Sequence, residues 1–299
     1  MLRPDGLFGD VVLVGRARDL ATSASGAASV DGEAGFLARV AFLAERSITG
    51  LATSPAEPAV SSLVGVKASG GFRGELDRAL PEHRDARSLL YLLLDDLPVA
   101  TLVSGYAFGA AGIRHPAGHR PSFPADLCAG WRTGGTMLAE IETSGAVPVS
   151  TGPIAPSLRR DDDPLAWHAF GPLPPHGMRR HRRLDLVHGD GHLVADVLFR
   201  DSHVSDEGEE TIVHEYTIRA AIDPAALRFE AIDARAHALP FVECNDAAAS
   251  ARRLAGRPVA DLRPRVRAAF GGASTCTHLN DTLRSLEDVA ALAARIRPA

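Results

Sequence analysis

The sequence predicts an α+β protein made of two related units, each an antiparallel sheet followed by helices. The second half carries the clearest pattern, because three segments, and a fourth less cleanly, alternate apolar and polar side chains, as strands with one buried face do. These segments are residues 183–187, 192–200, 211–222 and 228–236. Turn residues at 189–191 and 206–208 separate the first three, which favours a meander. Helical patterns then follow at 246–255, 261–270 and 277–296.

The first half repeats this order of elements less clearly. We expect a strand at 11–18, a turn at 23–29 and a β-compatible or mixed stretch at 35–48. Residues 72–80 have helical spacing, and residues 87–95 and 99–108 are strongly apolar. Pro98 is expected to stop or restart a helix between the two apolar stretches.

Proline and glycine recur between the halves, which predicts turns and extended backbone with one short helix near 136–142. The expected organisation is therefore a first α+β unit at 1–108, a Gly/Pro-rich connector or lid at 109–177, and a second α+β unit at 178–299.

Short matches between the halves indicate an internal pseudo-duplication. Both expected first strands end in Arg-Asp, at 18–19 and at 200–201, and Leu-Val-Gly at 63–65 resembles Leu-Ala-Gly at 254–256. Residues 88–92 take the place of residues 275–279, so the first copy has Leu89 and Tyr91 where the second has Cys276 and His278. The first unit is thus expected to be a degenerate copy that packs, and the second unit is expected to carry the reactive side chains.

Composition excludes several classes of protein. The 299 residues carry a net charge of −5, which argues against nucleic-acid binding. Mean hydropathy is +0.00, and the sequence contains no run of about eighteen apolar residues, so no membrane span is expected. Three cysteines and an N-terminus without an apolar signal core favour the cytoplasm. Glycine motifs for phosphate or dinucleotide binding are absent, so no cofactor is expected.

Polar side chains of several reactive types concentrate in the second half. If the strands of the meander are neighbours, side chains at alternate positions meet on one surface of the sheet. The candidate catalytic residues are His203, His214, Cys276, His278, Asp201 and Glu215. Histidine would act as acid or base, a carboxylate would orient it, and Cys276 would be a nucleophile whose pKa is lowered at a helix N-terminus.

Other residues are candidates for binding. A basic run at 179–183 could hold an anionic substrate through Arg183, or it could be the solvated edge of a strand. Trp131 lies among glycines and could close a lid over a pocket, and Tyr216 and Cys244 complete the expected substrate-binding set. A zinc site at His214, Cys244, Cys276 and His278 is an alternative, although their spacing matches no common zinc motif and no metal is expected.

Two motifs resemble a known family. Cys-Thr-His-Leu at 276–279, preceded by a strand with a histidine and by Pro-Phe-Val-Glu-Cys at 240–244, resembles a bacterial family described as a domain of unknown function, number 2889. The spacing from proline to cysteine is one residue longer here than in that family. The resemblance covers about residues 178–290 and implies no reaction.

These observations favour a cytoplasmic enzyme that acts on a small anionic or acyl-type metabolite as a hydrolase, lyase or isomerase, without a redox cofactor. The alternative is a non-catalytic binding or scaffold protein in which the same residues satisfy one another inside the core. The expected partner is a small molecule rather than nucleic acid or a membrane, and a homo-oligomer is compatible with the sequence.

Overall fold

The chain forms two compact units, and each is an antiparallel sheet with helices, so the predicted α+β class is confirmed. The computed structural model describes residues 1–113, 125–145 and 147–296. Residues 1–107 and 156–178 make up the first unit, and residues 108–155 and 179–299 the second. The stretch 109–177, expected as a connector, is thus divided between the units, and its residues 114–124 and 146 lie outside the described part.

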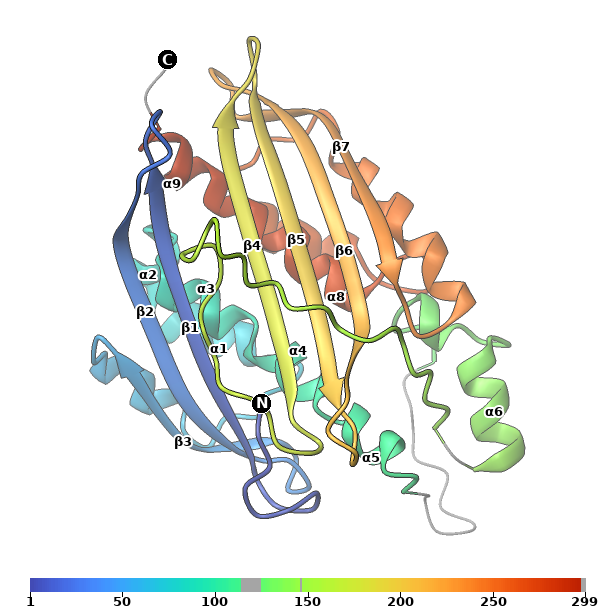
Figure 1. Cartoon of the computed structure of the whole chain (residues 1–299). Coiled ribbons are helices and arrows are strands. Elements are labelled where there is room, and N and C mark those ends of the chain that lie inside the picture. The colour runs from blue at the N-terminus through green and yellow to red at the C-terminus, as the bar shows by residue number, and fades with distance from the viewer. Residues whose placement is uncertain (114–124, 146, 297–299) are drawn as a thin grey trace. The chain divides into compact units, whose positions relative to one another are not determined.

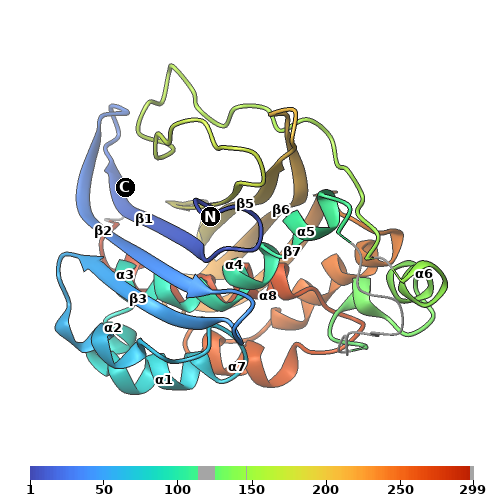
Figure 2. The same ribbon diagram turned by 90° about the horizontal axis from the view of Figure 1, so that it is seen from below.

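The first unit begins with a three-stranded meander in the order β1-β2-β3. Its strands are β1 (Val11–Thr22), β2 (Ala28–Ala41) and β3 (Ser47–Ser54). The helices that follow are η1 (Pro58–Leu63), α1 (Phe72–Ala79), α2 (Pro81–Asp85), α3 (Leu89–Asp95) and α4 (Leu97–Val103), with α5 (Tyr106–Ala110) after them. Helices α1 to α3 lie on one face of the sheet (Figure 2). Leu13 and Ala38 of the strands are buried in one cluster with Phe72 and Leu94 of the helices.

The second unit contains a four-stranded meander in the order β4-β5-β6-β7, as the alternating segments predicted (Figure 1). Its strands are β4 (Met178–His188), β5 (Leu193–Val204), β6 (Glu210–Asp223) and β7 (Arg228–Ala238). The helices are η2 (Ala129–Trp131), α6 (Thr136–Ser144), η3 (Val242–Leu254), α7 (Leu262–Ala269), α8 (Thr277–Ser285), η4 (Leu286–Asp288) and α9 (Val289–Ala293). The short helix expected near 136–142 is α6, so that prediction is confirmed.

One face of this sheet packs on the helices, because alternate side chains of its central strands are apolar. Phe199 of β5 and Tyr216 and Ile218 of β6 are buried in one cluster with Leu279 and Leu283 of α8. Helix α8 runs across this face of the sheet (Figure 1). Helix α8 therefore places side chains against β5 and β6, the two strands that carry Asp201 and His214.

Strand β7 covers only part of β6, and the chain before β4 completes the pairing. The register of β7 begins opposite Glu215. Before that point, Ile212 donates its N–H to Pro153 O at 2.9 Å, and Ala155 donates its N–H to Glu210 O at 2.8 Å. A glycine is required next to this pairing, because a Cβ at Gly152 would lie 1.9 Å from the carbonyl oxygen of Ile212.

One helical stretch, residues 89–110, is long and apolar enough to cross a membrane by length and composition. Its most apolar window is 61% buried within the protein, as in the core helix of a globular unit.

Candidate functional site

Asp201, His214 and His278 form a compact polar cluster on the buried face of the second sheet. Asp201 on β5 is the cross-strand partner of His214 on β6, and His278 comes from the first turn of α8. One ligand atom from each residue lies within 4.8 Å of the others. The rings of His214 and His278 stack with centroids 3.8 Å apart and an interplanar angle of 22°. The cluster thus joins three elements that are distant in sequence.

The carboxylate of Asp201 is held in place by Arg180 of β4. Arg180 donates from Nε to Oδ1 at 2.9 Å and from Nη2 to Oδ2 at 2.8 Å, a bidentate contact. Its third nitrogen, Nη1, donates to Asp281 of α8 at 3.1 Å, and Asp281 also accepts from Arg284 at 2.5 Å. The side chains of Asp201 and Asp281 are fully buried, and that of Arg180 is only 8% exposed. This network fixes the orientation of the carboxylate that faces the two imidazoles.

Each of the two imidazoles has one buried ring nitrogen without a hydrogen bond to the described residues. Among the described residues, none bonds to Nδ1 of His214 or to Nε2 of His278. Nε2 of His278 lies 3.7 Å from Asp201 Oδ2, too far for a hydrogen bond. Each buried polar atom left unpaired costs about 1–3 kcal/mol. The three side chains therefore do not satisfy all of one another's hydrogen-bonding groups.

Both rings are uncharged near neutral pH. Burial lowers the pKa of His214, and the adjacent His278 lowers it further. Burial also lowers the pKa of His278, with a smaller contribution from the charge of Arg180. A neutral imidazole can accept a proton or bind a metal ion, so these rings suit either kind of chemistry.

Cys276 is the N-cap residue of α8, at the helix start that the sequence predicted, but its thiol does not have the expected lowered pKa. Burial raises the pKa of Cys276 to about 11, and this outweighs the amide hydrogen bonds at the helix N-terminus that lower it. The prediction of a thiol with a lowered pKa is therefore wrong. The Sγ atom lies 3.8 Å from Nδ1 of His278, beside the ring rather than at the face that meets Asp201.

The three cysteines of the chain gather around Tyr216. The Tyr216 hydroxyl is buried next to the Cys276 thiol, and burial followed by that thiol raises the pKa of Tyr216. Cys244 of η3 and Cys128 are close enough to affect the pKa of the same hydroxyl. Burial raises the pKa of Cys244 to about 12. Trp131 is the last residue of η2 and donates its backbone N–H to the carbonyl oxygen of Cys128, the N-cap residue, at 3.0 Å.

Glu215 lies away from the cluster, because its side chain points to the opposite face of β6. There it pairs with Arg200, the cross-strand neighbour of Glu215 on β5. His203 is buried near the end of β5, after the register shift that follows Asp201. It does not belong to the group formed by Asp201, His214 and His278. Neither residue is brought together with the stacked histidines.

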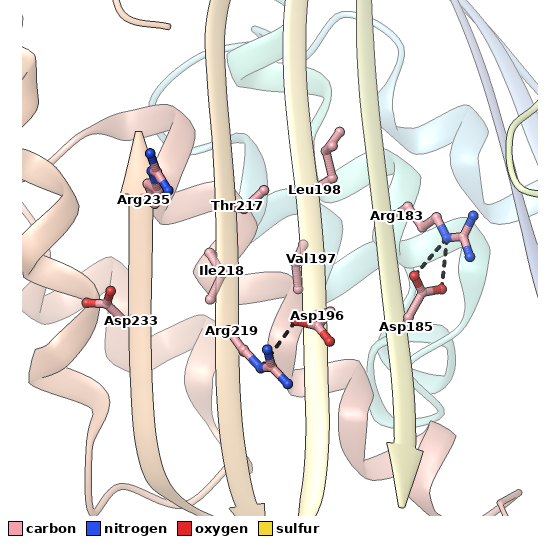
Figure 3. Close-up of a pocket in the computed structure, with 10 residues that line it drawn as sticks. All are labelled: Arg183, Asp185, Asp196, Val197, Leu198, Thr217, Ile218, Arg219, Asp233 and Arg235. Carbon is pink, nitrogen blue, oxygen red and sulfur yellow. Dashed lines mark hydrogen bonds and ion pairs between the residues drawn. The ribbon is translucent and has the colours of Figure 1, made fainter. Parts of the chain in front are cut away.

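Arg183 also lies on the outer face of the sheet, where it donates to Asp185 of the same strand at 2.8 Å. It lines an open hollow of about 410 Å³ (Figure 3). The hollow is lined by charged side chains of both signs from β4 to β7, such as Asp196 and Arg219. An anion held by Arg183 would thus be separated from the histidines by the thickness of the sheet.

Arg180, Asp281 and Arg284 belong to the site as well, although they were not among the residues predicted from the sequence. A usable signal existed, because a strand alternates its faces, so the basic run at 179–183 must send Arg180 and Arg183 to opposite sides. Asp281 and Arg284 are three residues apart on α8, the spacing at which helical side chains meet.

The zinc ligands weighed in the sequence analysis are divided between two places. His214 and His278 stack on each other, whereas Cys244 lies near Tyr216. Cys276 is next to Tyr216 as well, and its Sγ reaches only the Nδ1 side of His278, at 3.8 Å. In the described part of the chain, the group of potential metal ligands around these histidines is completed by Asp201.

Comparison with protein families gives one match. Residues 178–292 match the model of a family described as "Protein of unknown function (DUF2889)". This segment contains the cluster and agrees with the resemblance inferred from the Cys-Thr-His-Leu motif, which is thereby confirmed. No curated protein and no solved structure matches the chain.

Proposed function

We propose that the protein is a small-molecule enzyme whose catalytic centre is the cluster of Asp201, His214 and His278. The proposed chemistry is that of a hydrolase, lyase or isomerase that needs no redox cofactor, acting on a small acyl-type metabolite. The observation that carries the proposal is the pair of buried ring nitrogens without hydrogen bonds next to a fixed carboxylate. Such an arrangement costs stability, and buried polar groups of this kind concentrate at functional sites.

We also infer that the two units are copies of one ancestral unit, the pseudo-duplication expected from the sequence. The support is that equivalent backbone hydrogen bonds occur at equivalent places in the two units. In the first unit, Gly65 donates its N–H to Ile48 O at 2.8 Å, where η1 returns to β3. In the second unit, Gly256 donates its N–H to Phe229 O at the same distance, where η3 returns to β7.

The strand registers support the same inference. A register shift follows Asp19 in the pairing of β1 with β2, and one follows Asp201 in the pairing of β5 with β6. Asp19 lies opposite Gly32, as Asp201 lies opposite His214. Gly32 is therefore the counterpart of His214.

The helix caps complete the comparison. Ser88 is the N-cap residue of α3 and Cys276 is that of α8, so Leu90 is the counterpart of His278. This moves the alignment made from sequence by one residue. Because the same framework forms in the first unit with a glycine and a leucine at these places, it does not need the histidine pair. This favours a functional role over a structural one.

The chemistry follows from the uncharged state of the rings. An imidazole without a hydrogen bond at a ring nitrogen can accept a proton from a carbon next to a carbonyl group, or from a water molecule that attacks an acyl group. Asp201 would stabilise the imidazolium that forms, and Arg180 would keep Asp201 oriented. Three free cysteines support the proposed cytoplasmic location.

The alternative is a non-catalytic scaffold or binding protein, and one observation favours it. His214 is only 8% exposed and the side chain of His278 is 11% exposed, so a substrate has little access to the rings. Catalysis therefore requires an opening at the N-terminal end of α8, where Thr277 and His278 are partly exposed.

A panel of small compounds tests the proposal. Nitrophenyl esters, coenzyme A thioesters, lactones and hydroxy acids would be incubated with the full chain, and products identified by mass spectrometry. We expect turnover that is lost in His214→Gln and retained in His237→Gln, a control on β7 whose ring bonds to Thr217 away from the cluster. Turnover that survives both His214→Gln and His278→Gln would refute the assignment of the centre.

A further inference from the structure

We infer that Asp201, His214 and His278 bind a divalent first-row metal ion such as Zn²⁺. The inference takes from the proposed function only the position of the centre, and binding can be measured without turnover. Two imidazole nitrogens and one carboxylate oxygen are the donor atoms that such ions prefer, and three protein ligands with an open position are typical of catalytic zinc sites.

The spacing of the donor atoms is close to that of a metal site. Two ligands of a tetrahedral zinc ion lie about 3.3 Å apart, given metal–ligand distances near 2.0 Å. Asp201 Oδ2 and His278 Nε2 are 3.7 Å apart, and the whole group lies within 4.8 Å. The rings of His214 and His278 are stacked with centroids 3.8 Å apart, so ring nitrogens of both residues lie close to the carboxylate of Asp201.

The unpaired ring nitrogens provide independent support. His214 is more than nine-tenths buried, and within the described residues its Nδ1 has no hydrogen-bond partner. Nε2 of His278 is in the same state and faces Asp201. One ion at this position would satisfy both nitrogens at once. An ion also needs far less space than a metabolite, which fits the closed surroundings of the cluster.

The neighbours of the three residues resemble the outer shell of a metal site. Metal-binding histidines usually direct the second ring nitrogen to a hydrogen-bond partner, which fixes the ring. Nδ1 of His278 lies 3.4 Å from Thr277 Oγ1 and 3.8 Å from Cys276 Sγ, leaving Nε2 for the ion. The carboxylate of Asp201 is oriented by its two hydrogen bonds from Arg180.

The charge around the site limits the affinity. Asp201 and Asp281 contribute two negative charges, and Arg180 and Arg284 contribute two positive charges. The ion therefore enters a locally neutral environment with a guanidinium nearby. We expect a dissociation constant on the order of micromolar rather than the much tighter binding of thiolate sites.

Calorimetric titration of the chelator-treated full chain with ZnCl₂ tests the inference, with Co²⁺ used to record the visible absorption of a tetrahedral site. We expect one equivalent to bind, and the affinity to fall by about 100-fold or more in His214→Gln and in His278→Leu. His237→Gln controls for surface histidines and should bind as the wild type does. Circular dichroism would confirm that each variant is folded, and His278→Leu places in the cluster the residue type found at its counterpart Leu90.

The absence of a saturable equivalent, or equal zinc binding in all four proteins, would overturn the inference. Its failure is distinguishable from that of the proposed function. Turnover that needs His214 in protein without bound metal would leave the enzyme proposal standing and refute the metal site. Metal bound at the cluster without any turnover would support the site and count against the enzyme.

Discussion

Replacing Arg180 should destabilise the second unit much more than replacing its neighbour Arg183. Arg180→Met removes three hydrogen bonds to buried carboxylates, two to Asp201 and one to Asp281. Asp281 keeps Arg284, but the fully buried Asp201 loses the guanidinium that pairs with both of its carboxylate oxygens. Breaking a buried ion pair in this way costs about 3–5 kcal/mol.

Arg183→Met is the matched control on the same strand. The side chains of Arg183 and its partner Asp185 are 32% and 48% exposed, so the pair is solvated and its loss should cost less than about 1 kcal/mol. Urea unfolding followed by circular dichroism, with a chelator present, measures both variants. Adding Asp201→Asn to Arg180→Met should recover part of the lost free energy, because it removes the unpaired charge. A loss below about 1 kcal/mol for Arg180→Met would refute the view that Arg180 anchors this carboxylate.

Three further outcomes are expected. Gly152→Ala should lower the free energy of unfolding, because the added Cβ would lie 1.9 Å from the carbonyl oxygen of Ile212. Gly271→Ala, where nothing lies within 4 Å of the added Cβ, should leave that free energy unchanged, and urea unfolding of both variants measures the difference. Burial lowers the pKa of His181 to about 4, so the folded state binds fewer protons than the unfolded state between pH 6.5 and 4. The stability that depends on this ring is present above pH 6.5 and is lost as the pH falls toward 4, by up to about 3 kcal/mol. In His181→Gln, the free energy of unfolding measured by urea titration should therefore fall less steeply over this pH range. Because the pKa of Cys244 is about 12, iodoacetamide at pH 8 should leave it unmodified in the native protein and label it in urea, as peptide mass spectrometry would show.

The strands and helices of the second half could be predicted because their side chains follow simple periods. Alternation identified β5 and β6, and in the structure the same alternation puts His214 and Tyr216 on one face of β6 and Glu215 on the other. The sequence did not indicate that η3 is a 3-10 helix, since such a segment has the same composition as an α-helix of that length.

The site was predicted in part. Asp201, His214 and His278 were named because reactive residue types cluster near them, and the structure brings these three together. The partner that fixes Asp201 was missed, because a run of five basic residues looks like a single patch when the alternation of its faces is not followed. The state of Cys276 was also beyond the sequence, since a helix N-terminus is readable from letters but the burial that raises the thiol pKa is a tertiary property.

The most direct test of the central claim, that this histidine pair serves function rather than folding, is the free energy of unfolding of His278→Leu in the presence of a chelator. Leucine is the residue at the counterpart position in α3, where it packs in the core of the first unit. We predict a stability equal to or higher than that of the wild type, because the substitution removes a buried nitrogen without a hydrogen bond. A loss of more than about 2 kcal/mol would contradict the claim and identify the histidine pair as part of the fold's own support.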